Sequence, residues 1–180
     1  MVEDVLKYNE VFVENKGYEK YLTSRYPDKK IAVVSCMDTR LVELLPAALG
    51  FKNGDVKMIK NAGGVILQPF DTSVRSLMVA IFELGVNEVM VIGHTDCGAQ
   101  RMTCESVLTH MKERGISEDS INKVDQCGLD LESWLSGFSD IQSAIMSSVE
   151  LLREHPLIPE DVVIHGFMID SSTGKLTYLG

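Results

Sequence analysis

Short runs of small and β-branched apolar residues recur along the chain, and they constrain its fold more than any other feature. The first covers residues 31–35, and runs of the same kind follow at 56–60 and 88–92. Continuous apolar runs of this length are typical of strands that are buried on both faces of a parallel sheet. Because helical segments separate the runs, the sequence predicts a βαβ arrangement.

Two amphipathic segments give the clearest helix predictions. Residues 72–84 have apolar side chains at three- and four-residue spacing, which predicts a well-buried helix that lies against the sheet and ends at Gly85. Nearer the C-terminus, Ser139 and Gln142 have the spacing of a capping box at the start of a second helix. Pro156 is expected to stop that helix.

The two ends of the chain complete the predicted fold. Residues 162–169 predict a fourth buried strand, and the polar turn after it sends residues 175–179 back as a short antiparallel edge strand. Residues 1–25 are predicted to form a helical N-terminal arm that packs on a partner subunit. The sequence therefore predicts one α/β domain over residues 1–180, with a central, mostly parallel β-sheet flanked by helices.

The composition limits the partners of the chain. With 180 residues, of which 45% are hydrophobic, the chain can bury a core without disulfides, and its formal net charge of -9 opposes binding to nucleic acid or anionic membranes. Its apolar runs fall well short of the roughly 20 residues of a membrane span, and its acidic start lacks the pattern of a secretory signal. We therefore expect a cytoplasmic location, where cysteines more often bind metals or act in catalysis than form disulfides.

Two cysteines and a histidine stand where a parallel sheet binds its ligands. Cys36 ends the first predicted strand and His94 follows the third, and the crevice beyond the carboxyl ends of parallel strands is the usual binding place. Cys97 adds a second thiol close to His94. Two sulfurs and an imidazole form a soft donor set suited to zinc, and three protein ligands leave a fourth position free, as in catalytic zinc sites.

A carboxylate and an arginine accompany the first cysteine. Asp38 can bind the metal directly or accept a hydrogen bond from its water, and Arg40 can hold that carboxylate by a paired hydrogen bond. Two interpretations of Asp96 stay open: the cap of a helix that begins near Gly98, or a contact to a zinc ligand. The other thiols and imidazoles have no paired ligand nearby in the sequence and are expected to be structural: Cys104, Cys127, His110, His155 and His165.

Three segments resemble the signature segments of the β-class carbonic anhydrases. They are Cys-Met-Asp-Thr-Arg at 36–40, Lys-Asn-Ala-Gly-Gly at 60–64 and Gly-His-Thr-Asp-Cys-Gly at 93–98. The resemblance implies an α/β fold, an obligate homodimer or a higher homo-oligomer, and zinc on the residues Cys36, His94 and Cys97. It also implies a dyad of Asp38 and Arg40, in which Asp38 takes the fourth zinc position in a closed site and is withdrawn by Arg40 in an open one.

The resemblance further implies reversible hydration of carbon dioxide to bicarbonate by a metal-bound hydroxide, with no organic cofactor. Two other interpretations of the same site stay open. Hydrolysis of carbonyl sulfide or carbon disulfide needs the same nucleophile, and a zinc-binding protein without turnover needs only the same ligands. Thiol redox chemistry is disfavoured because the chain has no Cys-x-x-Cys motif.

Overall fold

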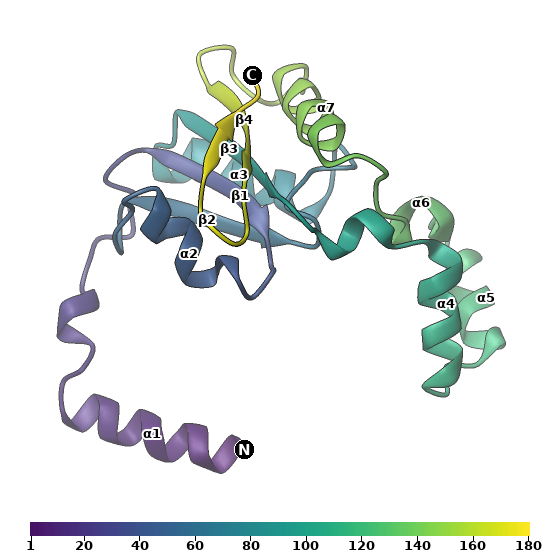
Figure 1. Ribbon diagram of the computed structural model, residues 1–180, viewed down its shortest axis with the longest axis horizontal. Helices are drawn as coiled ribbons and strands as arrows, with labels where there is room; N and C mark the ends of the chain where they lie inside the picture. Colours follow the sequence, from purple (N-terminus) through teal and green to yellow (C-terminus); the bar gives the residue numbers. More distant parts are fainter.

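A five-stranded sheet forms the centre of the protein (Figure 1). The computed structural model describes the backbone of residues 1–180 and every side chain except that of residue 125. The strand order is β2-β1-β3-β4-β5, in which the first four strands are parallel and β5 is antiparallel to β4. This sheet confirms the predicted α/β fold. The strands are β1 (Ile31–Cys36), β2 (Val56–Asn61), β3 (Glu88–His94), β4 (Val163–Ile169) and β5 (Leu176–Tyr178).

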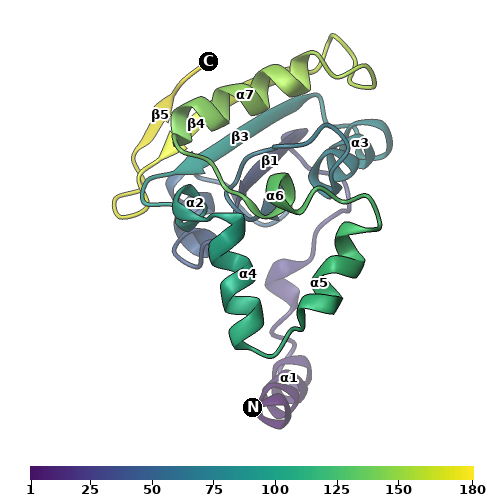
Figure 2. The same cartoon turned by 90° about the vertical axis from the view of Figure 1, so that its right-hand side faces the viewer.

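Helices pack on both faces of the sheet and bury two apolar clusters. On one face, α3 (Thr72–Leu84) and α7 (Ile141–Arg153) cover side chains of β1, β3 and β4 (Figure 2). On the other face, α2 (Leu41–Ala48) buries Leu41 and Leu45 against Val33 and Ile92. The second cluster also contains Cys36 and Cys97, so the apolar core reaches the carboxyl edge of the sheet.

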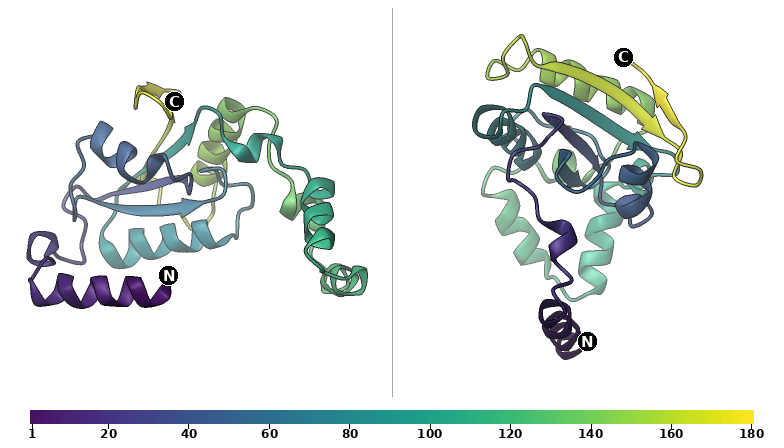
Figure 3. Two further views of the ribbon diagram at one scale, coloured as in Figure 1. Left: turned by 60° about the horizontal axis from the view of Figure 1, so that its bottom comes forward. Right: turned by 90° about the vertical axis from the view of Figure 1, so that its left-hand side faces the viewer.

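Two helical segments extend away from this body (Figures 1 and 3). The first is the N-terminal α1 (Val2–Glu14), which is followed by the short η1 (Glu19–Tyr21) and has no buried residue. The second follows η2 (Gly98–Arg101) and consists of α4 (Cys104–Glu113), α5 (Glu118–Asp125) and α6 (Leu131–Leu135). Among the described residues, no helix has both the length and the apolar composition needed to cross a membrane.

Two local predictions are wrong. Residues 56–60 were expected to be buried on both faces, but β2 is an edge strand whose residues are mostly half-buried. The cap of α7 is Asp140, whose side chain accepts a hydrogen bond from Ser143 N at 2.8 Å, rather than the box of Ser139 and Gln142. Ser139 and Asp140 are both residue types that favour the N-cap position, and Asp140 takes it because its backbone is extended there.

The strand order brings distant residues to one edge. β1 and β3 are neighbours in register, with Ser35 opposite Ile92, so their carboxyl ends lie side by side although more than 50 residues separate them in sequence. On the other side of β1, Cys36 lies opposite Asn61 of β2. The ends of three strands therefore meet around Cys36.

Gly64, just after β2, allows the chain to pass close to this edge. Its φ is 70°, and an added Cβ would lie 2.5 Å from the backbone nitrogen of Cys36 and 3.1 Å from the carbonyl oxygen of Ile92. Because these atoms belong to central strands, we expect Gly64→Ala to lower the free energy of unfolding by about 2–5 kcal/mol, from backbone strain and overpacking together.

Gly50 provides the matched control, since its φ is 68° and an added Cβ there would have no neighbour within 4 Å. Gly50→Ala should cost only the left-handed backbone strain of about 1–2 kcal/mol. Urea unfolding of the two variants compares the losses. Equal losses would mean that the close approach of Gly64 to Cys36 does not constrain the fold.

Candidate metal centre

The three predicted donors lie together at the carboxyl edge of the sheet. Cys36 ends β1, His94 ends β3, and Cys97 stands on the loop that follows. One ligand atom from each can be chosen so that all three lie within 4.8 Å of one another, and the two sulfurs are 3.9 Å apart. All three side chains are buried, with exposures of 6%, 0% and 4%. Such a group could hold a metal ion.

The imidazole of His94 shows that this group suits a metal. Its Nδ1 pairs with the carbonyl oxygen of Thr95 at 2.8 Å, which fixes that nitrogen as the N–H donor and leaves a lone pair on Nε2. Among the described residues, Nε2 of His94 is the buried side-chain nitrogen or oxygen atom that has no hydrogen-bond partner. A buried polar atom without a partner is costly, and a soft set of two thiols and one imidazole satisfies it best by binding Zn²⁺.

The two thiols differ in acidity. Burial would raise the pKa of Cys36, but His94 in its protonated form and the backbone N–H groups of Asp38 and Gly63 lower it to about 7. Burial raises the pKa of Cys97 to about 11, and the neighbouring Cys36 adds to this effect. Near neutral pH, Cys97 therefore holds a proton that a metal ion must displace.

Zinc uptake is consequently expected to tighten as the pH rises. Since a thiol must lose its proton to bind the metal, the apparent zinc affinity should increase roughly tenfold per pH unit where only one thiol is still protonated. That range lies between the pKa of Cys36, about 7, and the pKa of Cys97, about 11. The increase should be steeper where His94, whose pKa is lowered by burial but raised overall by Cys36, is protonated as well. Competition with a chelator of known proton affinity measures the slope, and an affinity that stays constant between the two pKa values would contradict it.

Asp38 and Arg40 form a bidentate pair beside the donors. Arg40 donates from Nε to Oδ1 of Asp38 at 3.0 Å and from Nη2 to Oδ2 at 2.8 Å. The hydrogen bonds from Arg40 hold the pKa of Asp38 well below its usual range, so the carboxylate stays ionised. Its Oδ2 also lies 3.9 Å from Nε2 of His94. The pair predicted from the sequence therefore exists, with the carboxylate next to the donor group.

Asp96 has neither of the two roles considered from the sequence. The cap position of η2 is Cys97, and the carboxylate of Asp96 accepts a hydrogen bond from Nη1 of Arg40 at 3.2 Å. Its backbone oxygen accepts a second one from Nη2 of Arg40 at 3.1 Å. Arg40 thus contacts two aspartates from different loops, a connection that the sequence spacing did not reveal.

Lys60 and Asn61 support the site from β2, and sequence analysis assigned them no role. Lys60 Nζ donates to the carbonyl oxygen of Cys36 at 3.1 Å and to Ser35 Oγ at 3.2 Å. The side-chain oxygen of Asn61 accepts from Gly64 N at 2.8 Å, which fixes the turn against β1. Their place in the Lys-Asn-Ala-Gly-Gly segment, directly at the end of a predicted strand, was the signal that could have identified them.

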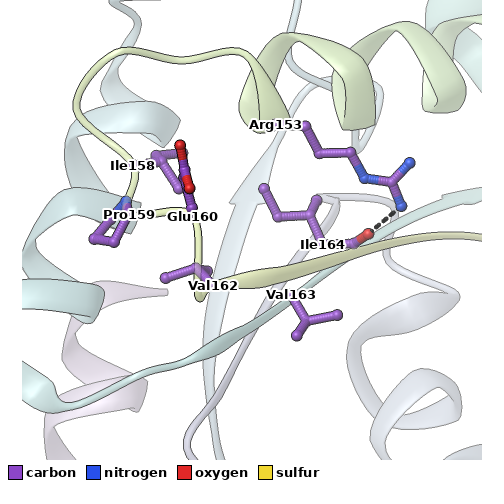
Figure 4. A pocket seen from close by; sticks show the side chains of 7 residues that line it. All are labelled: Arg153, Ile158, Pro159, Glu160, Val162, Val163 and Ile164. Carbon is purple, nitrogen blue, oxygen red and sulfur yellow. Dashed lines mark hydrogen bonds between the residues drawn. The ribbon is translucent and has the colours of Figure 1, made fainter.

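A cavity of about 510 Å³ opens over the donors and is mostly apolar. Its lining includes Cys36, Asp38, Arg40 and Cys97, together with small or apolar residues such as Ala62, Ala99 and Met102. Another pocket, near the amino end of β4, contains no cysteine or histidine, and its Arg153 donates to the carbonyl oxygen of Ile164 at 2.6 Å (Figure 4). Only the first of these two pockets combines soft donors with space for a substrate.

The fold and the site define an α/β protein with a soft Cys-His-Cys donor group at the carboxyl edge of a parallel sheet. The family model described as carbonic anhydrase matches residues 31–176. The chain belongs to the β-carbonic anhydrase family.

Relatives of two kinds resemble the chain. It is 47% identical over 176 residues to the Bacillus subtilis protein named "Putative carbonic anhydrase YtiB", covering 98% of this chain and 94% of the relative. It is 32% identical over 157 residues to a carbon disulfide hydrolase of Acidithiobacillus thiooxidans, covering 83% and 76%. The crystal structure of β-carbonic anhydrase isoform I from Trichomonas vaginalis superposes with a TM-score of 0.89 and 37% identity, covering 99% and 97% of the two chains.

Proposed function

We propose that this protein is a zinc-dependent carbonic anhydrase that interconverts carbon dioxide plus water with bicarbonate plus a proton. The observation that carries the proposal is the ionised Asp38, which is paired with Arg40 and lies beside three buried soft donors. A Zn²⁺ ion held by Cys36, His94 and Cys97 would lower the pKa of water and so supply a nucleophile near neutral pH. The reaction requires no organic cofactor.

Asp38 orients the nucleophile. An ionised carboxylate can only accept hydrogen bonds, so it draws the hydrogen of the nucleophile toward itself and leaves a lone pair directed at the substrate. Arg40 holds Asp38 in this orientation and keeps it ionised, which makes Arg40 a positioning residue. In the closed state that the family resemblance implies, the carboxylate of Asp38 would instead take the fourth metal position.

The cavity favours a small uncharged substrate. Ala62, Ala99 and Met102 present apolar surface near the donors, which suits carbon dioxide better than a charged ligand. Arg40, the cation in this lining, is already paired with Asp38 and Asp96, so bicarbonate, the charged product, would be held weakly and could leave through the opening of the cavity.

A second candidate activity is the hydrolysis of carbon disulfide or carbonyl sulfide. It is supported by the resemblance to carbon disulfide hydrolases at 32% identity, whereas the higher identity of 47% to a protein named for carbonic anhydrase activity favours carbon dioxide. A zinc-binding protein without turnover is the remaining alternative.

Parallel assays on one preparation of known zinc content test these possibilities. Stopped-flow measurement with a pH indicator follows carbon dioxide hydration, and hydrogen sulfide release follows carbon disulfide hydrolysis. We expect fast hydration and little sulfide. Fast sulfide release with slow hydration would make the protein a carbon disulfide hydrolase, and no turnover of either substrate with zinc bound would make it a zinc-binding protein.

We also propose that the protein is a homodimer or a higher homo-oligomer in the cytoplasm. α1 exposes Val5, Leu6 and Tyr8, and none of its residues is buried within one chain. An isolated helix of its 13 residues is marginal in water, so residues 1–25 are proposed to pack on a partner subunit. Light scattering on the full chain and on a chain lacking residues 1–25 tests this, and a monomeric full chain would refute it.

The proposed location in the cytoplasm is supported by the four free cysteines, which suit a reducing compartment.

A further inference from the structure

Arg40 has more hydrogen bonds than its pair with Asp38 accounts for. Its Nε and Nη2 donate to the two carboxylate oxygens of Asp38, its Nη1 donates to the carboxylate of Asp96, and its Nη2 also donates to the backbone oxygen of Asp96. A guanidinium has five N–H groups, and these contacts use all but one of them. The orientation of the guanidinium plane therefore depends on both aspartates.

The backbone of Asp96 is shaped for this contact. Its φ is 54°, in the left-handed region that L-residues other than Asn and Asp rarely adopt. In this conformation the carbonyl oxygen and the carboxylate of the same residue both reach Arg40. Asp96, which lies between the candidate ligands His94 and Cys97, thus offers Arg40 two hydrogen-bond acceptors because its backbone is left-handed.

The loop that carries Asp96 is anchored independently of Arg40. Thr95 N donates to the carbonyl oxygen of Ile169 at 3.0 Å, and Ser171 N donates to Thr95 Oγ1 at 3.1 Å. These bonds attach the loop to the end of β4. Asp96 thus offers Arg40 a fixed support that does not depend on where the carboxylate of Asp38 points.

We propose that Asp96 is a positioning residue that acts through Arg40 to keep Asp38 in its paired orientation. The inference rests on the function proposed above, in which Asp38 orients the nucleophile only while it is paired with Arg40. Without the carboxylate of Asp96, the half-exposed Arg40 side chain would be held by Asp38 and by one backbone oxygen. The backbone N–H of Arg40 would still donate to Oδ1 of Asp38 at 2.9 Å, but the guanidinium that holds Oδ2 could shift, and Oδ2 would lose its fixed direction.

Three variants test this proposal. Asp96→Gly keeps the left-handed backbone but removes the carboxylate, Asp96→Asn keeps both the conformation and a side-chain oxygen acceptor, and Glu43→Gln removes one negative charge from the first turn of α2. We expect kcat for carbon dioxide hydration to fall about 10- to 100-fold in Asp96→Gly, the range found when residues that hydrogen-bond to metal ligands are replaced.

Zinc content and the thermal midpoint of Asp96→Gly should be unchanged, because an exposed ion pair adds little stability. Asp96→Asn should restore most of the rate, and Glu43→Gln should match wild type.

A second measurement does not depend on activity. In ¹⁵N-labelled protein, the exchange of the Arg40 guanidinium hydrogens with water should be slow in wild type and in Asp96→Asn, and clearly faster in Asp96→Gly. An Asp96→Gly protein with wild-type exchange and wild-type kcat would overturn the proposal and leave the carbonic anhydrase assignment intact. If wild type itself does not hydrate carbon dioxide, the proposed function fails, and the exchange experiment still decides whether Asp96 holds Arg40.

Discussion

The Cys97→Ser protein is expected to lose its zinc, whereas wild type should carry about one ion per chain. Serine is nearly the same size as cysteine, so the buried position should stay packed while its soft donor is removed. The two ligands left, Cys36 and His94, should hold zinc more than about 100-fold less tightly, since even changes behind the ligands cost 10- to 100-fold. Metal analysis after dialysis measures the effect, and carbon dioxide hydration should disappear with the metal.

Two other thiols provide the controls. Cys104 is buried at the start of α4 and Cys127 is exposed, and neither belongs to the donor group. Cys104→Ser and Cys127→Ser should therefore retain zinc. Full zinc content in Cys97→Ser, or loss of zinc from either control, would remove the proposed site.

Asp38→Ala is expected to keep zinc and to lose roughly 10²- to 10³-fold in kcat, the loss typical when one positioned hydrogen-bonding group at a reacting centre is removed. The three donors remain in this variant, so the metal should stay bound. The nucleophile, however, would lack the acceptor that directs its hydrogen away from the substrate. Zinc analysis together with stopped-flow hydration separates these effects.

Arg40→Ala should behave differently from Asp38→Ala. Without the bidentate bonds from the guanidinium, the carboxylate of Asp38 would keep only the hydrogen bond from the backbone N–H of residue 40 to Oδ1. Its Oδ2, which lies 3.9 Å from Nε2 of His94, would then be free to move toward the donor group. We then expect Asp38 to occupy the fourth metal position over a wider pH range and to block the reaction. Absorption spectra of cobalt-substituted protein report the ligands in each variant. If Asp38→Ala hydrated carbon dioxide like wild type, the dyad would have no catalytic role even with the metal site intact.

The central strands could be predicted closely because each depends on local sequence. The run at 31–35 became β1 (Ile31–Cys36), and the helix expected over 72–84 became α3 with Gly85 as its left-handed cap. A buried strand needs a continuous apolar run, and a helix end needs a residue that accepts a positive φ. Both requirements are visible within a few neighbouring residues.

The surroundings of the donors were less accessible to sequence reasoning. The hydrogen bond from Lys60 to the carbonyl oxygen of Cys36 depends on β2 pairing with β1, and the contact of Arg40 with Asp96 joins residues 56 positions apart. The edge position of β2 is likewise a property of the whole sheet. No local pattern encodes these relations, because the same apolar run fits a central or an edge strand until the strand order is known.

The sequence by itself determined the α/β class and the donor types, because apolar periodicity and the chemistry of thiols, imidazole and carboxylate belong to individual residues and short spacings. Only the tertiary structure decided that β1 lies beside β3, which places Cys36 and His94 together and leaves His94 Nε2 buried without a partner. Only the tertiary structure, too, gave Arg40 its second aspartate, Asp96. The physical reason is that long-range contacts follow from sheet register and from the packing of separate loops, which are set by the free energy of the whole fold.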